Sequence, residues 1–367
     1  MSDFENNDNK NDKNKKTGLI VFIAVIAIAV VYSVVTSIIS ARSKNSDYTT
    51  WQPSSSSSQN SGFNFSRFPF TTQNKSDNGP KIPKYSKYLA KIYITGTIEA
   101  EGPSYNQEWL LESIDMLKED SNNVGILLVI DSPGGTVYEA DGTYLALLDY
   151  KRETGRPVYA YMQSMAASGG YYIACAADYI MANRNTLTGS IGVIAGSSVD
   201  LTGLMEKYGI KYTTIHSGKN KNMGNYNEPL TAEQVQIMQS IADEAYEQFV
   251  GIVADSRGMP VDDVKTLADG RIYTAAQALK NGLIDEVLMQ DKNAVPTMQN
   301  RAFDGEEYEE VEFKYEESQS FYDLFTEAMT QFSSATSSSS AGLPKAVEQS
   351  LERTISGPAY YYDGILR

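Results

Sequence analysis

Apolar and polar positions divide the chain of 367 residues into five stretches with different patterns. Residues 19–40 are uncharged and dominated by Ile, Val and Ala. A helix rises about 1.5 Å per residue, so this stretch is long enough to cross a hydrocarbon core of roughly 30 Å. Polar residues fill positions 1–18, and residues 41–84 are rich in Ser, Asn, Gln and Thr without periodicity, which is typical of a flexible spacer. The sequence therefore predicts a transmembrane helix followed by a spacer.

Charges on the two sides of the apolar run predict its orientation. Four lysines precede the run between positions 10 and 16, and only Arg42 and Lys44 follow it closely. Cytoplasmic flanks carry the excess of basic residues, so we expect a cytoplasmic N-terminus and a domain outside the cell membrane. A cleaved signal peptide is the competing interpretation, but the run exceeds the usual ~7–15 apolar residues of such a signal.

Residues 85–298 alternate between short apolar runs and helical patterns, and residues 299–367 form an acidic and Ser-rich tail. The β-like runs are Ile92–Ile94, Val124–Ile130, Val158–Tyr161, Tyr179–Ala182 and Ile191–Ile194. The helical patterns are Tyr105–Lys118, Val137–Arg152, Ser168–Ala177 and Leu201–Tyr208. Strands interleaved with helices predict an α/β domain with a largely parallel sheet.

Two capping boxes mark further helices. Thr231 with Gln234 opens a helix through Asp255, whose apolar stripe is Met238, Ile241, Ala242, Ala245 and Phe249. Thr274 with Gln277 starts a helix that stops at Gly282.

Composition restricts the chemistry that the chain can perform. The formal net charge of -15 disfavours a general nucleic-acid binder. One cysteine, Cys175, and one histidine, His216, cannot form a disulfide framework or a Cys/His zinc cluster, although a carboxylate metal site stays open. A Ser/His/Asp triad would have to use His216.

Two glycine-marked turns follow predicted strands, at Asp131-Ser132-Pro133-Gly134-Gly135 and at Met165-Ala166-Ala167-Ser168-Gly169-Gly170. Glycines at a strand end let backbone N–H groups point outward, as a site that stabilises an oxyanion requires. Each turn alone has a simpler interpretation, a plain turn or a helix cap. Together they predict an exposed Ser168 hydroxyl beside N–H donors from Gly169 and Gly135.

Four motifs in order resemble the signal peptide peptidase A family: the DSPGG turn, MAASGGYY, LTGSIGV at residues 187–193 and DGRIYT at residues 269–274. The resemblance covers residues 91–287 and implies a crotonase/Clp-protease-like α/β fold with a membrane anchor. It implies a serine endopeptidase that degrades remnant signal peptides with a Ser/Lys dyad and no cofactor. The chain is similar to the short form, with one protease unit and a dyad completed between neighbouring subunits of a ring-shaped homo-oligomer.

The resemblance also assigns residues. Ser168 is the nucleophile, Gly135 and Gly169 supply the oxyanion donors, and Ser190 orients the lysine base. That base is Lys221 when the match runs forward from Ser217-Gly218, with Lys219 as the alternative. A lysine base must be neutral, which burial in an apolar pocket favours by lowering its pKa by up to ~3–5 units.

Other interpretations stay open at this point. They are a triad that uses His216, Cys175 as nucleophile, an acyl-CoA hydratase or isomerase, and a catalytically silent membrane scaffold. The last residues raise a separate question, because Tyr360-Tyr361-Tyr362 and an Ile-Leu end are unusual in a disordered tail. They predict a segment that docks on the protein, with a frayed end as the alternative.

Overall fold

A computed structural model describes residues 48–50, 80–316 and 359–361 of the chain. The predicted transmembrane helix and nearly all of the spacer lie outside these residues. Within the described ranges, no helix has the length and apolar character needed to cross a membrane. Strand β1 (Tyr48–Thr50) lies in the predicted spacer.

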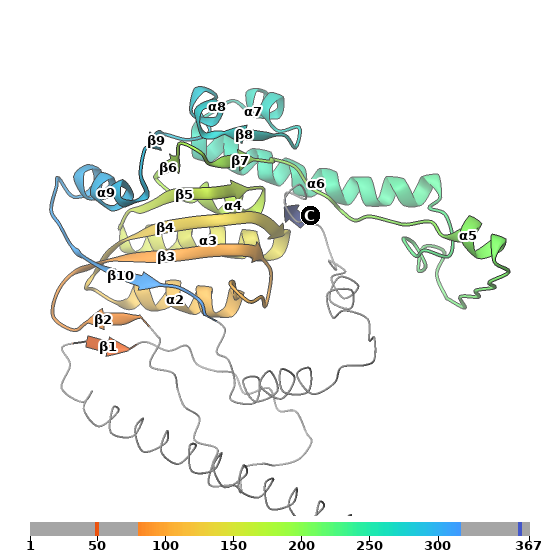
Figure 1. Cartoon of the computed structure of the whole chain (residues 1–367), viewed down its shortest axis with the longest axis horizontal. Coiled ribbons are helices and arrows are strands. Elements are labelled where there is room, and N and C mark those ends of the chain that lie inside the picture. Colours follow the sequence, from red (N-terminus) through yellow and green to blue (C-terminus); the bar gives the residue numbers. More distant parts are fainter. Residues whose placement is uncertain (1–47, 51–79, 317–358, 362–367) are drawn as a thin grey trace, which may run out of the picture. The chain divides into compact units, whose positions relative to one another are not determined.

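A nine-stranded sheet forms the centre of the fold (Figure 1). Six strands lie in the order β10-β3-β4-β5-β6-β9, and every pair along this path is parallel. Strand β7 pairs in parallel with the last three residues of β5, and β8 pairs with β7 in the antiparallel sense. The predicted α/β class with a largely parallel sheet is confirmed. The strands besides β1 are β2 (Lys81–Pro83), β3 (Tyr88–Ile98), β4 (Asn123–Thr136), β5 (Val158–Ala167), β6 (Tyr179–Asn183), β7 (Leu187–Gly189), β8 (Ile272–Thr274), β9 (Glu286–Leu288), β10 (Glu309–Phe313) and β11 (Ala359–Tyr361).

Helices cover the two faces of the sheet unequally. Residues of α2, α3, α4 and α6 pack with alternate residues of the central strands, such as Ile126 and Leu128, in one large apolar core. The intervening residues Leu127 and Val129 pack with α9 in a smaller core on the other face. The helices are α2 (Gln107–Glu119), α3 (Val137–Thr154), α4 (Gly169–Ala174), α5 (Thr202–Lys207), α6 (Ala232–Arg257), α7 (Val261–Leu267), α8 (Ala275–Lys280), the 3-10 turn η3 (Asp291–Asn293) and α9 (Ala294–Ala302).

Both predicted capping boxes are present. The Thr231 hydroxyl accepts from the Gln234 N–H at 3.2 Å, and the Gln234 side chain accepts from the Thr231 N–H at 3.0 Å. Thr274 and Gln277 make the same exchange before α8. The apolar stripe predicted for α6 is buried only at its inner end, where Phe249 is fully covered, whereas Ile241 is 40% exposed.

Four expectations differ from the structure. Asp131–Gly135 were expected as a turn after a strand that ends at Ile130, but β4 continues through them to Thr136, with a register shift between Ile130 and Ser132. Residues 191–194 were expected as a strand, but the strand lies earlier, at β7, because Leu187–Gly189 continue the pairing of β5. Helix α4 ends at Ala174 rather than Ala177. The acidic run, expected in a tail after residue 298, forms β10 beside β3, where Lys91 binds Glu310 at 3.1 Å and Glu312 at 3.0 Å.

An ion pair fastens the end of α6 to the sheet. The Arg257 guanidinium donates to both carboxylate oxygens of Asp285, at 2.6 and 3.0 Å, and to the Gly282 carbonyl at 2.9 Å. The same carboxylate accepts from the Ile180 N–H of β6 at 2.7 Å. Its removal leaves a largely buried guanidinium with little compensation.

We therefore expect Asp285→Ala to lower the free energy of unfolding by about 3–5 kcal/mol. The matched control is the next residue, because Glu286 makes a more exposed pair with Arg301 at 3.2 Å. Glu286→Ala should cost no more than about 1 kcal/mol. Urea titrations of both variants measure the difference, and equal losses would contradict a structural role for the Arg257 pair.

Candidate active site

Ser168 lies where β5 ends and α4 begins, with an unusual backbone conformation. Its φ is 52° and its ψ is -117°, outside the regions that residues other than glycine favour. Two hydrogen bonds hold this backbone: the Ser168 N–H donates to Gly189 O at 2.8 Å, and Ser168 O accepts from the Tyr172 N–H at 2.9 Å. Such a conformation costs ~1–3 kcal/mol and persists only where the surroundings impose it.

The hydroxyl of Ser168 is not used for structure. Ser168 occupies the N-cap position of α4, but its side chain makes no capping hydrogen bond. The prediction of an exposed hydroxyl is wrong, because the residue is 1% exposed and its Oγ is buried. Within the described part of the chain this Oγ has no hydrogen-bond partner. A buried polar group without a partner is costly, so the arrangement suits chemistry better than helix capping.

The DSPGG segment at the end of β4 lies beside Ser168, because Ser132 pairs with Ala166 at the end of β5. The Ser132 hydroxyl orders this segment by donating to Gly96 O at 2.6 Å and accepting from the Gly134 N–H at 3.1 Å. At Gly135 only glycine fits, since a Cβ would come within 1.8 Å of Ile98 O. Strand β4 thus brings Gly135 to the same end of the sheet as Ser168.

Beyond Ser132 the strands β4 and β5 separate, and β11 takes the place of β5. Residues Gly134–Thr136 of β4 keep β3 on one side and pair on the other with β11 in the antiparallel sense, with Tyr360 opposite Gly135. Strand β11 also contacts α3 and α4. The chain's own C-terminal segment therefore docks as an added strand at the predicted oxyanion strand, as extended peptides do on exposed sheet edges.

Ser190 also lies close to Ser168. Strand β7 pairs with the last residues of β5, with Gly189 opposite Ala167, and Ser190 follows directly. Ser190 is buried, has a φ of 52°, and donates its N–H to Arg271 O at 2.8 Å. The fold thus gathers Ser168, Gly169, Gly135 and Ser190 at one end of the sheet.

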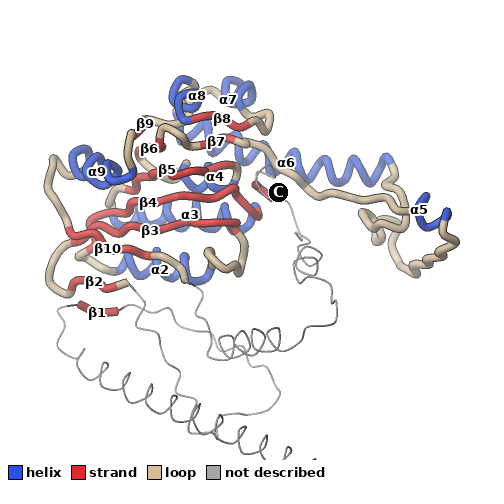
Figure 2. The backbone as a smooth tube through the Cα atoms, viewed as in Figure 1, coloured by secondary structure: helices blue, strands red, loops and turns tan. Residues whose placement is uncertain are grey.

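The candidate bases lie elsewhere, on residues 194–230, which we call the arm. Figures 1 and 2 show the arm extending from β7 past α6, mostly as loop. Lys221 is exposed there, Lys219 forms an ion pair with Glu233, and His216 has its Nδ1 3.1 Å from Gly218 O. Among the described residues, none of the three makes a hydrogen bond with the Ser168 hydroxyl, so neither the dyad nor the His216 triad is assembled in this structure of a single chain.

Cys175 is an unsuitable nucleophile. The residue is buried at the end of α4, and burial raises the pKa of its thiol to about 12. A thiol that stays protonated at neutral pH is inert. Among the residues described here, no group of three or more His, Cys, Asp or Glu side chains is arranged to hold a metal ion.

Two parts of the site escaped the sequence reasoning. Ser132 belongs to the DSPGG motif, but the sequence alone does not show that its hydroxyl binds Gly96 O and the Gly134 N–H. Tyr172 follows Ser168 in MAASGGYY, where an aromatic residue at a helical position resembles ordinary core, and its hydroxyl contacts are made to distant helices.

Comparisons with known proteins find a matching family and several similar sequences. The model of peptidase family S49 matches residues 150–302. A candidate signal peptide peptidase SppA of Enterococcus faecium is 37% identical over 55% of this chain and 60% of its own length. A candidate protease of Synechocystis sp. is 38% identical over 55% of this chain and 70% of its own length. The chloroplastic serine protease SPPA of Arabidopsis thaliana is 38% identical over 53% of this chain, which spans 28% of that protein.

Among solved structures, a ClpP1 mutant from Listeria monocytogenes matches 56% of this chain and 94% of its own, with 17% identity and a TM-score of 0.38. The chain spans less than two thirds of the Enterococcus and Arabidopsis proteins, but it covers more than two thirds of the Synechocystis protein. This level of identity over most of a relative places the chain by descent, and the chain belongs to peptidase family S49.

Proposed function

We propose that this chain is a serine endopeptidase in which Ser168 is the nucleophile and Lys221 of a neighbouring copy is the general base. The observation that carries the proposal is the buried, unpaired Ser168 hydroxyl on a strained backbone beside Gly135 and Gly169. In the reaction, Ser168 Oγ attacks the peptide carbonyl carbon while the neutral lysine amine takes the hydroxyl proton. Backbone N–H groups of Gly135 and Gly169 donate to the oxyanion that forms.

The remaining steps balance with water alone. The protonated lysine returns its proton to the leaving amine, which departs and leaves an ester on Ser168. A water molecule then attacks the ester, the lysine again takes a proton, and the acid product leaves with the serine hydroxyl restored. Ser190, which follows Gly189 beside the end of β5, is the residue to which we assign the orienting of the lysine amine.

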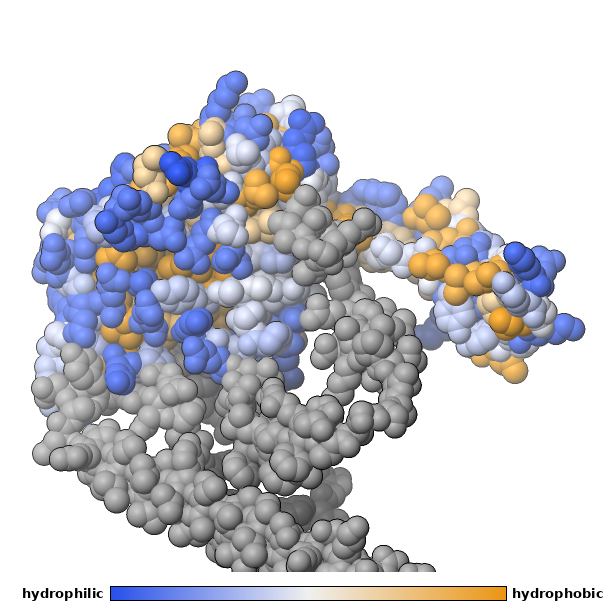
Figure 3. Space-filling model, viewed as in Figure 1, coloured by the Kyte–Doolittle hydropathy of each residue, from blue (hydrophilic) through white to orange (hydrophobic). Residues whose placement is uncertain are grey.

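The exposed apolar surface of the arm supports a shared site. Ile215 is 95% exposed and Tyr208 68% exposed, and the arm carries further exposed apolar residues. Figure 3 shows apolar side chains gathered on this part of the molecule. Soluble proteins rarely leave such patches uncovered, so the arm suits an interface with a second copy.

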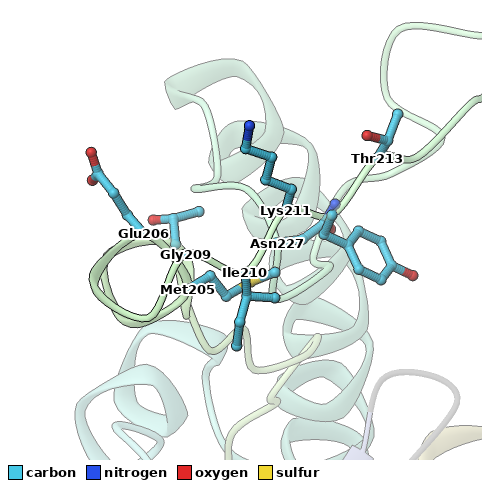
Figure 4. A pocket seen from close by; sticks show the side chains of 9 residues that line it. Met205, Glu206, Gly209, Ile210, Lys211, Thr213 and Asn227 are labelled. Carbon is cyan, nitrogen blue, oxygen red and sulfur yellow. The ribbon is translucent and has the colours of Figure 1, made fainter.

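A pocket on the arm fits the same interpretation. It has a volume of about 490 Å³ and is lined by Met205, Ile210 and Asn227 among others (Figure 4). Side chains from a neighbouring copy would enter it, with apolar ones against Met205 and Ile210 and polar ones beside Glu206 and Lys211. If the arm of each copy binds the next copy, every copy both gives an arm and receives one. We therefore propose a closed, ring-shaped homo-oligomer with one dyad at each interface.

Remnant signal peptides are the proposed substrates. The β11 position accepts an extended chain through main-chain hydrogen bonds, and signal peptides freed from their preproteins are short and unfolded. The apolar residues 19–40 would hold the enzyme at the membrane in which these peptides remain.

The nucleophile and the base are tested by two variants and their mixture. Ser168→Ala and Lys221→Ala should each abolish cleavage of an unstructured fluorogenic peptide, whereas Lys219→Ala should lose little activity. If subunits exchange randomly around a ring, an equal mixture of the two inactive variants should recover about one quarter of the activity, because one interface in four combines an intact serine with an intact lysine.

Four outcomes would redirect the proposal. Normal peptide turnover by Ser168→Ala would exclude Ser168 as the nucleophile. A parent protein that neither cleaves the peptide nor is labelled by an active-site-directed serine reagent would favour a silent scaffold or acyl-CoA chemistry. Inactive Lys219→Ala with active Lys221→Ala would move the base by two residues. A rate that reaches its plateau below pH 6.5 and is lost in His216→Ala would favour a histidine base, since a lysine base predicts activity that rises toward alkaline pH.

The membrane orientation has its own test. The lysines before residue 19 predict a cytoplasmic N-terminus and an external protease domain. A protease added to intact protoplasts should therefore cleave within or beyond the spacer, residues 41–84. Complete protection of the domain, with cleavage only after membrane rupture, would reverse the assignment.

The C-terminal segment is proposed to restrain the enzyme. Strand β11 occupies the position of an extended substrate, and a flexible tether gives such a segment a millimolar effective concentration. Deleting residues after Glu348 should raise the cleavage rate of a short peptide without changing the oligomer. Tyr360→Pro should act like the deletion, because it removes a main-chain N–H opposite Gly135, and Tyr360→Phe should not. Unchanged rates with a protease-sensitive tail would support a frayed end.

A further inference from the structure

The Tyr172 hydroxyl joins three helices through two other side chains. The hydroxyl donates to Asp141 Oδ1 of α3 at 2.6 Å and accepts from Gln248 Nε2 of α6 at 2.6 Å. Gln248 Nε2 also donates to the same oxygen of Asp141, at 3.0 Å. Tyr172 itself lies in α4 and is fully buried. We call Tyr172, Asp141 and Gln248 the hydroxyl junction.

Each helix at the hydroxyl junction continues into a different part of the proposed site. Helix α4 follows Ser168 directly. Helix α3 begins after Thr136, the last residue of the strand that carries Gly135. Helix α6 begins at Ala232, where the arm that carries Lys221 ends. The junction therefore ties the elements that hold the nucleophile and the oxyanion donor to the helix that follows the arm, whose own Lys221 is proposed to serve a neighbouring copy.

Tyr172 also acts directly on the backbone of Ser168. Its N–H donates to Ser168 O at 2.9 Å, so its position limits the rotation of the strained residue. The Tyr172 ring is clamped by Tyr144 and Phe249, with ring centroids 5.5 and 5.0 Å away. Packing thus fixes the plane of the Tyr172 ring, and the hydroxyl junction fixes the position of its hydroxyl.

We propose that Tyr172 is a positioning residue, whose hydroxyl sets the placement of Ser168 relative to Gly135. The inference rests on the proposed role of Ser168 as nucleophile. A hydrogen bond to a carboxylate is stronger and more directional than one between neutral groups, so its loss frees the end of a ring coupled to the Ser168 carbonyl. A displacement near 1 Å in an active site costs up to about 100-fold in rate.

The neighbouring Tyr171 provides a matched control. It is also fully buried in α4, and its hydroxyl donates to Leu283 O at 2.7 Å, in the loop before β9. Tyr171→Phe and Tyr172→Phe each delete one hydroxyl from a buried phenol of the same helix. Only Tyr172→Phe breaks the hydroxyl junction.

The experiment compares peptide hydrolysis and serine labelling in the full-length protein. Tyr172→Phe should lower kcat by about 10- to 100-fold with little change in KM, and should slow phosphonylation of Ser168 by a serine-directed reagent in proportion. Tyr171→Phe should keep kcat within about threefold, since loss of one hydroxyl without the junction affects stability rather than positioning. The pH profile should keep its shape in both variants, because neither hydroxyl exchanges a proton with substrate.

Conservative replacement at Asp141 gives a second readout. Asp141→Asn retains an oxygen that accepts from Tyr172, so it should keep more of the activity than Asp141→Leu, which removes the acceptor. Thermal unfolding of every variant shows whether the fold is intact at the assay temperature. Equal kcat losses in Tyr172→Phe and Tyr171→Phe, or an effect on KM alone, would overturn the positioning role.

The failure of this proposal is distinguishable from failure of the proposed function. If the Ser168→Ala variant is active, Ser168 is not the nucleophile, and both proposals are wrong. An inactive Ser168→Ala variant together with a Tyr172→Phe variant of normal kcat removes only the positioning role.

Discussion

The separation of β4 from β5 is the constraint on which the site depends. The two strands pair from Ile126 to Ser132, and then β5 turns into α4 while β4 runs on to Thr136. That divergence forces Ser168 into a strained backbone and leaves one side of Gly134–Thr136 without its former neighbour. The strained backbone of the proposed nucleophile and the strand position that β11 fills thus both arise where β4 and β5 separate.

Much of the fold is legible in the sequence because its strongest signals are local. Apolar runs located β4, β5 and β6, and capping boxes located α6 and α8, since these patterns depend on residues a few positions apart. Strand β10 was missed because its glutamates resemble a solvated tail. Lys91 of β3 binds Glu310 and Glu312, and Val311 and Phe313 alternate with these glutamates and are buried in the core. Two apolar residues are a short alternation, and the pairing with a distant strand leaves no local pattern.

The residues of the candidate site likewise divide into those with a local sequence signal and those without one. Glycine-marked turns identified Ser168, Gly169 and Gly135, because close backbone approaches restrict the residue type at single positions. The contribution of Tyr172 was invisible, since Asp141 and Gln248 reach its hydroxyl from helices far away in the chain. The placement of Lys221 outside the site of its own chain was not readable from periodicity either; only the family resemblance carried the expectation of a base from a second copy.

The two glycines opposite β11 have a consequence for what such a groove admits. Gly134 and Gly135 present main-chain atoms and no side chains to the added strand, so contacts at these positions depend little on the identity of the incoming residues. Discrimination then falls to the state of the polypeptide. In a folded protein the main-chain N–H and C=O groups of the strands are already hydrogen-bonded within its own sheets, whereas an unfolded fragment has main-chain groups available for pairing. A groove of this kind selects polypeptides by whether they are folded. It is therefore compatible with broad sequence specificity and with folded proteins nearby staying intact.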